Sequence, residues 1–468
     1  VQAINAAADD ASVKYIFLKT DGAAAGISQL QELRTSLANF RASGKPVIAY
    51  TESPSTGSYY LASVADKVFM TSNEGATTMI TGISSQLIFL KDLLDKLGVN
   101  VQLIRHGKYK SAGEMFIRNS SSPENMEQNQ VMINSIWNSY ASDIAQSRGL
   151  SVEQVNAAIN DLKLNLATDF LAEGFVDELL TRSELQARLA DLAVEKSYKD
   201  VNFIAFPDYV AAKVLPDLKA KKKVAIIYAE GDIVDGTAKQ NVAGDRFASM
   251  IAKVRADSTV KAVVLRVNSP GGSVLASDKI KTEIDLTIKD KPVVASFGDY
   301  AASGGYWISN SCEKIFANAT TLTGSIGVFS MIPDFSKVAR NVAHVTITPV
   351  NSNEHGDMFS LMRPFDDKER AYMQGSVEHI YETFVNVVAE GRGLEPDYVD
   401  SIAQGRVWAG SDALRIGLVD EIGTLEDAIR WTVSLVDEDA SKVAVEEYPK
   451  PQTTAEMLLA AFGQESDE

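Results

Sequence analysis

Residues 292–307 read PVVASFGDYAASGGYW and combine two patterns that predict how this part of the chain folds. The apolar run at residues 292–297 is typical of a buried strand. The small residues that follow allow a sharp turn into a helix. Such a junction would place the Ser303 hydroxyl and the Gly304 N–H at a helix N-terminus, which favours developing negative charge. A serine nucleophile and one oxyanion donor need that environment, although a plain tight turn uses the same residue types.

Strand-like and helix-like segments alternate around this junction. Residues 223–228 and 260–267 have the apolar, β-branched character of strands, and a further strand is expected near Ile315. Residues 245–255 and 276–288 have helical periodicity. The alternation predicts an α/β fold with mostly parallel sheets and flanking helices.

The same pattern occurs a second time, about 245 residues earlier in the chain. Residues 45–50 match residues 291–296, and residues 172–178 match residues 415–421. Chance similarity would not keep register over so many segments, so the sequence predicts a tandem duplication of one domain.

These matches set the predicted domain boundaries. The first copy lacks a counterpart of the strand at residues 223–228, so we expect its first strand to lie upstream of Val1. The predicted parts are a first copy at residues 1–183, a charged helical connector at 184–221, a second copy at 222–446 and a polar tail at 447–468.

The two copies differ where chemistry is expected. Ser303 aligns with Gly57, so the first copy lacks a hydroxyl at the nucleophile position. Residues 266–273 hold a Pro-Gly-Gly turn after a strand, whereas the matching residues 19–26 do not. Consecutive glycines expose backbone N–H groups. Gly272 is therefore a possible second oxyanion donor, with a purely structural turn as the alternative.

The first copy keeps a lysine that the second copy lacks. Lys110 lies within residues 106–112, whose counterpart at residues 348–354 contains no lysine. A lysine acts as a general base only if burial or nearby positive charge lowers its pKa from ~10.4 toward ~7. Neighbours such as Ala112 permit burial, and Ser325 could orient the amine by hydrogen bonding. An exposed lysine without a catalytic role is the alternative.

Composition excludes several classes of function. The net charge of −17 argues against nucleic-acid binding and against broad docking on anionic lipid. Four histidines are scattered without metal-ligand spacing, so we predict no metal site, and His106 remains the alternative base. No apolar run reaches the ~18 residues of a membrane span. There is no Walker A motif, so no nucleotide cofactor is expected.

Several short motifs together resemble those of the signal peptide peptidase A family, the long, duplicated form of the S49 serine peptidases. They occur in the family's order over nearly the whole chain. The matching motifs are residues 109–112 (YKSA), 268–272 (NSPGG), 302–306 (ASGGY), 323–328 (TGSIGV) and 404–408 (QGRVW).

The resemblance implies a Clp/crotonase-like fold and a serine endopeptidase with a Ser/Lys dyad that needs no cofactor. It implies Ser303 as the nucleophile, Lys110 as the general base, Ser325 as the hydrogen-bond partner of the lysine, and Gly304 with Gly272 as the oxyanion donors. It also implies a homotetramer at the bacterial inner membrane, with the catalytic domain on the periplasmic side. Its substrates would be cleaved signal peptides and other apolar peptides, and its N-terminal anchor is absent from this sequence.

Two other classes of function remain open. A crotonase-type acyl-CoA enzyme shares the expected fold and would need neither Ser303 nor Lys110. A non-catalytic assembly protein built from degenerate copies is the second alternative, but the complementary retention of the two residues speaks against it. The sequence does not decide whether Lys110 meets Ser303 within one chain or between protomers.

Overall fold

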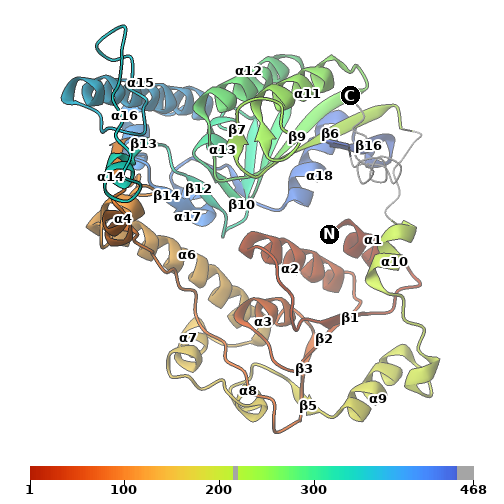
Figure 1. Cartoon of the computed structure of the whole chain (residues 1–468). Helices are drawn as coiled ribbons and strands as arrows, with labels where there is room; N and C mark the ends of the chain where they lie inside the picture. The colour runs from red at the N-terminus through yellow and green to blue at the C-terminus, as the bar shows by residue number, and fades with distance from the viewer. Residues whose placement is uncertain (214–219, 451–468) are drawn as a thin grey trace, which may run out of the picture. The chain divides into compact units, whose positions relative to one another are not determined.

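The computed structural model describes residues 1–213 and 220–450 of the 468-residue chain (Figure 1). The described residues divide into two compact units. Unit 1 comprises residues 1–213 and 318–422, and unit 2 comprises residues 220–317 and 423–450. Residues 214–219 of the predicted connector and residues 451–468 of the predicted tail lie outside the described part. The boundaries of the two copies stay a prediction.

Unit 2 is built on a parallel sheet in the order β11-β10-β9-β6-β16. Its strands are β6 (Lys222–Glu230), β9 (Val260–Ser269), β10 (Val293–Ala302), β11 (Lys314–Ala317) and β16 (Val443–Tyr448). Helices α11 (Gly244–Ala256) and α12 (Val274–Asp290) cover one face, and α18 (Leu425–Val436) covers the other (Figure 1). Residues such as Ile226 and Val264 are completely buried, as expected for parallel strands that are covered on both faces.

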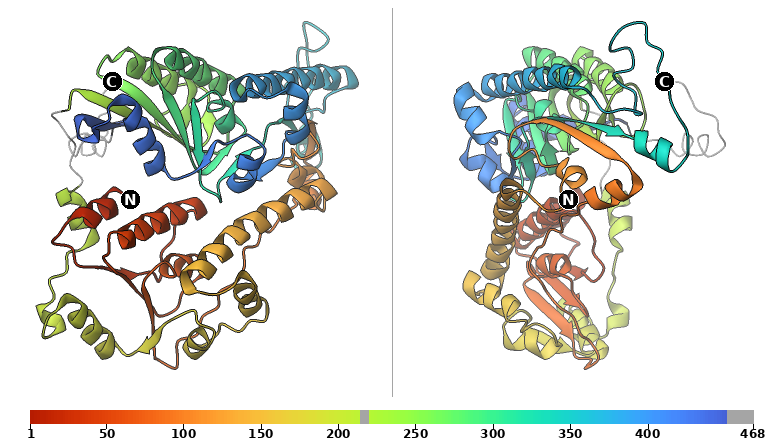
Figure 2. Two further views of the ribbon diagram at one scale, coloured as in Figure 1. Left: turned by 180° about the vertical axis from the view of Figure 1, so that it is seen from behind. Right: turned by 60° about the vertical axis from the view of Figure 1, so that its left-hand side comes forward.

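Unit 1 contains a second parallel sheet in the order β1-β2-β3-β5. The strands are β1 (Ile16–Lys19), β2 (Val47–Thr51), β3 (Lys67–Thr71) and β5 (Glu178–Leu180). Around it pack α2 (Ile27–Ala42), α3 (Thr56–Ala62) and the C-terminal half of α6 (Pro123–Arg148) (Figure 2). The predicted α/β class with mostly parallel sheets and flanking helices is confirmed.

Two antiparallel strand pairs of unit 1 position part of the candidate site. Strand β4 (Asn100–His106) pairs with β13 (Val328–Asp334), and Figure 2 shows the two side by side. Strand β12 (Leu322–Gly324) pairs with β14 (Val407–Ala409). Because Val328 lies opposite His106 in the first pair, the residues after β4 and those before β13 meet at the same end.

Two helices of 26 residues in unit 1 show the duplication in three dimensions. They are α6 (Pro123–Arg148) and α15 (Asp367–Arg392), and each ends at a glycine in the left-handed conformation. The arginine at the end of each helix pairs with an aspartate in the matching Gly-Phe/Leu-Val-Asp segment. These ion pairs are Arg148–Asp177 at 3.1 Å and Arg392–Asp420 at 2.5 Å.

Candidate active site

Ser303 lies in a strained turn between β10 and the short helix α13 (Gly304–Trp307). Its φ of 55° and ψ of −118° are unusual for a residue with a side chain. Its carbonyl accepts the N–H groups of Tyr306 and Trp307, at 3.0 and 2.9 Å, which fixes the turn. Backbone strain of this kind persists only where the surroundings enforce it, and it clusters at functional sites.

The Pro-Gly-Gly turn packs directly against Ser303. A Cβ on Gly271 would lie 2.6 Å from the Gly304 nitrogen and 2.8 Å from the Ser303 Cβ. A Cβ on Gly272 would lie 2.0 Å from the carbonyl oxygen of Ile233. Glycine is therefore required at both positions, where φ is 103° and 155°.

This packing brings the two predicted oxyanion donors together. A Cβ on Gly304 would lie 3.2 Å from the Gly272 nitrogen. Within residues 1–213 and 220–450, neither the Gly272 nor the Gly304 N–H donates to a protein acceptor. The neighbouring bonds, from Ile233 N–H to Gly271 O and from Ser273 N–H to Ile233 O, leave the Gly272 N–H unused. Because α13 has only four residues, the individual N–H groups contribute more than a helix dipole to stabilising a negative charge here.

Lys110 lies four residues beyond the end of β4 and is only 5 % exposed. Its Nζ donates to the Oγ and to the carbonyl oxygen of Ser325, both at 3.0 Å. The register of β4 and β13 explains this contact, because Ser325 lies three residues before β13. Burial lowers the pKa of Lys110 from 10.5 to about 7.

The predicted site residues thus form two groups in different units. Ser303, Gly304 and Gly272 come together in unit 2, and Lys110 and Ser325 come together in unit 1. Their catalytic roles stay predictions.

Several residues without a role predicted from the sequence contact these groups. Ile233, in the two-residue strand β7 (Ile233–Val234), bridges to Gly272, and so short a strand leaves no pattern in the sequence. Gly405 packs against Lys110, while Gln404 bonds to Tyr109 and Arg406 bonds to Ser325.

A cavity of about 400 Å³ in unit 1 lies next to Lys110. Ser111 and Ala112, which follow the lysine, line it together with the apolar side chains of Ile88, Met115 and Met132. A cavity of this size and lining suits an apolar side chain.

The first copy uses its serines differently. Ser55 is the N-cap of α3, where its Oγ accepts the Ser58 N–H at 3.2 Å, and Ser58 is 1 % exposed. The alignment of Ser303 with Gly57 stays a prediction. The hydroxyl in the first copy caps a helix.

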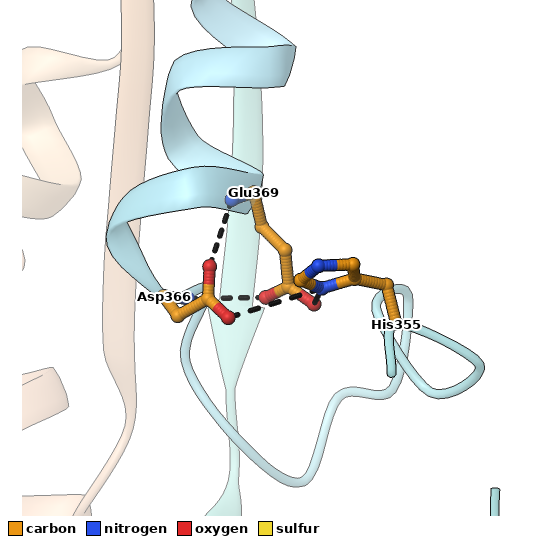
Figure 3. Close-up of side chains that lie close together, drawn as sticks. All are labelled: His355, Asp366 and Glu369. Carbon is orange, nitrogen blue, oxygen red and sulfur yellow. Dashed lines mark hydrogen bonds and ion pairs between the residues drawn. The ribbon is translucent and has the colours of Figure 1, made fainter. Parts of the chain in front are cut away.

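His355, Asp366 and Glu369 form a cluster at the start of α15 (Figure 3). The His355 Nδ1 lies 2.9 Å from a Glu369 oxygen, and Asp366 accepts the Glu369 N–H at 2.8 Å. Arg363 donates to both Glu369 oxygens, at 2.6 and 2.7 Å, and lowers the pKa of that carboxyl to about 2. Because Arg363 already neutralises Glu369, we interpret this cluster as an anchor that holds the preceding loop against α15.

The alternative base His106 lies at the end of β4, and its ring stacks on Tyr381 with centroids 3.9 Å apart.

In the described part of the chain, no helix has both the length and the apolar character that crossing a bilayer requires.

Comparisons with known proteins bear on what this arrangement does. The family model described as Peptidase family S49 matches residues 39–196 and 286–438, one segment in each half of the chain. "Protease 4" from Haemophilus influenzae is 37% identical over 454 residues, which cover 94% of this chain and 72% of that protein. A "Putative signal peptide peptidase SppA" from Enterococcus faecium is 36% identical over 227 residues, covering 47% of this chain and 65% of that protein.

Among solved structures, "ClpP1 N165D mutant from Listeria monocytogenes" aligns with 44% of this chain and 94% of its own at 17% identity, with a TM-score of 0.30. The family model covers more than half of the chain, in two segments, as the predicted duplication requires. This chain therefore belongs to peptidase family S49 and is a serine peptidase.

Proposed function

We propose that the protein is a serine endopeptidase in which Ser303 is the nucleophile and Lys110 is the general base. The observation that carries this proposal is the environment of Lys110. Its amine is buried, hydrogen-bonded to Ser325 and has a pKa of about 7. A large fraction of the amine is therefore neutral at physiological pH and able to accept a proton.

In the proposed reaction, neutral Lys110 removes the proton from the Ser303 Oγ as this oxygen attacks a peptide carbonyl carbon. The protonated amine then gives that proton to the leaving nitrogen as the C–N bond breaks, which leaves an acyl-enzyme. Water then attacks the acyl carbon as it loses a proton to the same amine. The amine returns this proton to the Ser303 Oγ as the ester bond breaks, which releases the carboxylic acid product and regenerates Ser303. This chemistry requires Lys110 and Ser303 to meet, within one chain or between two.

The N–H groups of Gly304 and Gly272 would stabilise the negative oxygen of the tetrahedral intermediate. Their closeness and their lack of another acceptor among the described residues support this role. Donors that are fixed before the reaction need no reorganisation when the charge develops.

We further propose that the substrates are cleaved signal peptides and other apolar peptides. The apolar cavity next to Lys110 supports this substrate class, as does the name of the relative from Enterococcus faecium. The family resemblance also leads us to propose a homotetramer at the bacterial inner membrane, with its catalytic part on the periplasmic side.

Labelling with a serine-directed fluorophosphonate tests the nucleophile. We expect mass spectrometry to find the label on Ser303 of the wild type and no label on the Ser303→Ala variant. Ser58→Ala is the matched control, because it removes a serine hydroxyl near a helix start in the first copy and should leave labelling unchanged. Ser303→Ala with near wild-type peptidase activity would rule out Ser303.

A further inference from the structure

Three backbone hydrogen bonds join residues 404–406 to the two segments that hold the proposed base and its partner. Residues 404–406 lie between α16 (Pro396–Ile402) and β14 in unit 1. The bonds run from Tyr109 N–H to Gln404 O (2.9 Å), from Gly405 N–H to Ile326 O (2.7 Å) and from Ser325 N–H to Arg406 O (2.7 Å). One tripeptide thus contacts both the Lys110 segment and the Ser325 segment.

Gly405 also forms part of the wall that buries Lys110. Its φ is 78°, and a Cβ at this position would lie 2.5 Å from the Lys110 Cβ and 2.7 Å from the Lys110 Cα. Gly327 approaches from the other segment, where an added Cβ would lie 2.6 Å from the Gly405 Cα and 3.2 Å from the Lys110 Cδ. Only glycine fits at both positions.

Gln404 adopts a conformation that needs outside support. Its φ of 53° is disfavoured for a residue with a side chain. The Tyr381 hydroxyl accepts the Gln404 backbone N–H at 3.3 Å and its side-chain amide at 3.1 Å. Asp400 accepts the same side-chain amide at 2.7 Å and the Tyr381 hydroxyl at 2.5 Å. These bonds hold Gln404 where its carbonyl reaches Tyr109.

We propose that residues 404–406, here named the 404–406 clamp, are positioning residues that hold Lys110 against Ser325 and away from solvent. Tyr381 and Asp400 support the clamp by fixing Gln404. The inference rests on the proposed role of Lys110 as the base. It assigns a function to residues that do not themselves take part in the chemistry.

The charged side chains near Lys110 are not the cause of its lowered pKa. Burial accounts for the lowered pKa of Lys110, and no neighbouring charge contributes to it. The charged or titratable groups on the surrounding segments are Arg105, His106 and Lys108 on the lysine's own segment, Glu114 on α5 (Glu114–Ile117), Glu127 on α6, Tyr381 on α15, Asp400 on α16 and Arg406 in the clamp. Loosening the clamp should therefore act mainly by admitting water to the amine.

The substitution Gly405→Ala tests the clamp directly. The added methyl group must push Lys110 away, so we expect the amine to regain hydration and its pKa to rise toward 10.5. A rise of one unit from about 7 would lower kcat/KM about fivefold at pH 7, with recovery above pH 8. Gly393→Ala is the matched control, because Gly393 also has a positive φ, of 63°, but has nothing within 4 Å of an added Cβ.

A second substitution tests the support of the clamp with a milder change. Tyr381→Phe removes the hydroxyl that holds Gln404, and we expect a smaller alkaline shift of the kcat/KM profile. Tyr372→Phe is its control, because Tyr372 lies on the same helix and is 67 % exposed. If Gly405→Ala does not fold, as judged by circular dichroism, Tyr381→Phe carries the test.

The readout is the pH midpoint of kcat/KM, which a purely structural role would not move. An alkaline shift in Gly405→Ala or Tyr381→Phe, with unchanged midpoints in both controls, supports the proposal. An unshifted midpoint in both variants overturns it, whether activity is retained or lost equally at every pH. The substitution Lys110→Met tests the proposed base separately from the clamp. An active Lys110→Met variant would refute the role of Lys110 as the base.

Discussion

The catalytic activity should rise with pH through neutrality, because the proposed base Lys110 must be neutral to accept a proton from the proposed nucleophile Ser303. The perturbation is a change of pH, which titrates an amine that is buried against Ser325. With burial as the cause of its lowered pKa, this amine should be the group that limits activity on the acidic side.

The size of the effect follows from the pKa. At pH 7, a lysine with the ordinary pKa of 10.5 is neutral in about one molecule in 3,000, whereas a pKa of about 7 makes about half of the molecules competent. Burial therefore raises the competent fraction by about three orders of magnitude. Between pH 6 and pH 8 the neutral fraction should increase about tenfold and then level off.

The assay is kcat/KM for a fluorogenic apolar peptide between pH 5.5 and 9.5, in buffers of constant ionic strength. Lys110→Arg should be inactive at every pH, because a guanidinium stays protonated. Lys108→Met provides the control, since it removes an exposed lysine two residues away and should keep the wild-type profile. A profile that is flat or falls with pH, or an active Lys110→Arg, would refute the lysine mechanism and return attention to His106.

Three further predictions follow from the same geometry. Ser325→Ala should lower kcat/KM about tenfold at pH 8 without abolishing it, because the amine loses one hydrogen bond but keeps the one to the residue 325 carbonyl. Lys110→Met should raise the melting temperature at pH 6 and much less at pH 10. The pKa of Lys110 is lower in the folded state than in the unfolded state, so burying the protonated amine lowers the free energy of unfolding by ~5 kcal/mol. This penalty is complete below pH 7 and vanishes above pH 10.5. Equal changes of the melting temperature at both pH values would contradict this. Peptides rich in leucine should be cleaved faster than charged, leucine-free peptides of equal length, and equal rates in a competition assay would exclude the apolar cavity as a subsite.

Regular elements with a clear local pattern were predictable from the sequence. The helices predicted at residues 245–255 and 276–288 correspond to α11 (Gly244–Ala256) and α12 (Val274–Asp290), because their apolar period is a local signal. Helix α12 begins two residues earlier than predicted, at Val274, because the Ser273 side chain accepts the Ala276 N–H as an N-cap. Strand β10 extends past Gly298 to Ala302, because a change of register in its pairing with β9 accommodates the extra residues.

The lowered pKa of Lys110 could not be predicted from the lysine segment alone. The segment contains nothing that distinguishes Lys110 from the exposed Lys108, two residues before it. The groups that bury the amine come from Ser325, Gly327 and Gly405, more than 200 residues later in the chain. Its environment depends on strand register and close glycine packing, which only a folded chain displays.

Backbone strain at Ser303 and in the segments around Lys110 supports the roles that we propose for each group of residues. Seven non-glycine residues in the described part of the chain have a left-handed φ, and three of them are Ser303, Ser325 and Gln404. Each is held by contacts with neighbouring segments, and each lies in one of the motifs that carried the family resemblance. Strained conformations persist where the surrounding structure enforces them.

The five motifs can therefore be understood as two sets of physical contacts. Residues 268–272 and 302–306 meet around Ser303, where Gly271, Gly272 and Gly304 allow two backbones to touch. Residues 109–112, 323–328 and 404–408 meet around Lys110, where two further glycines perform the same task. In both sets a side chain at these glycine positions would collide with the backbone or a side chain of a neighbouring segment. The glycines of these motifs are therefore as necessary to the proposed chemistry as the serine and the lysine, because they determine where those two side chains lie.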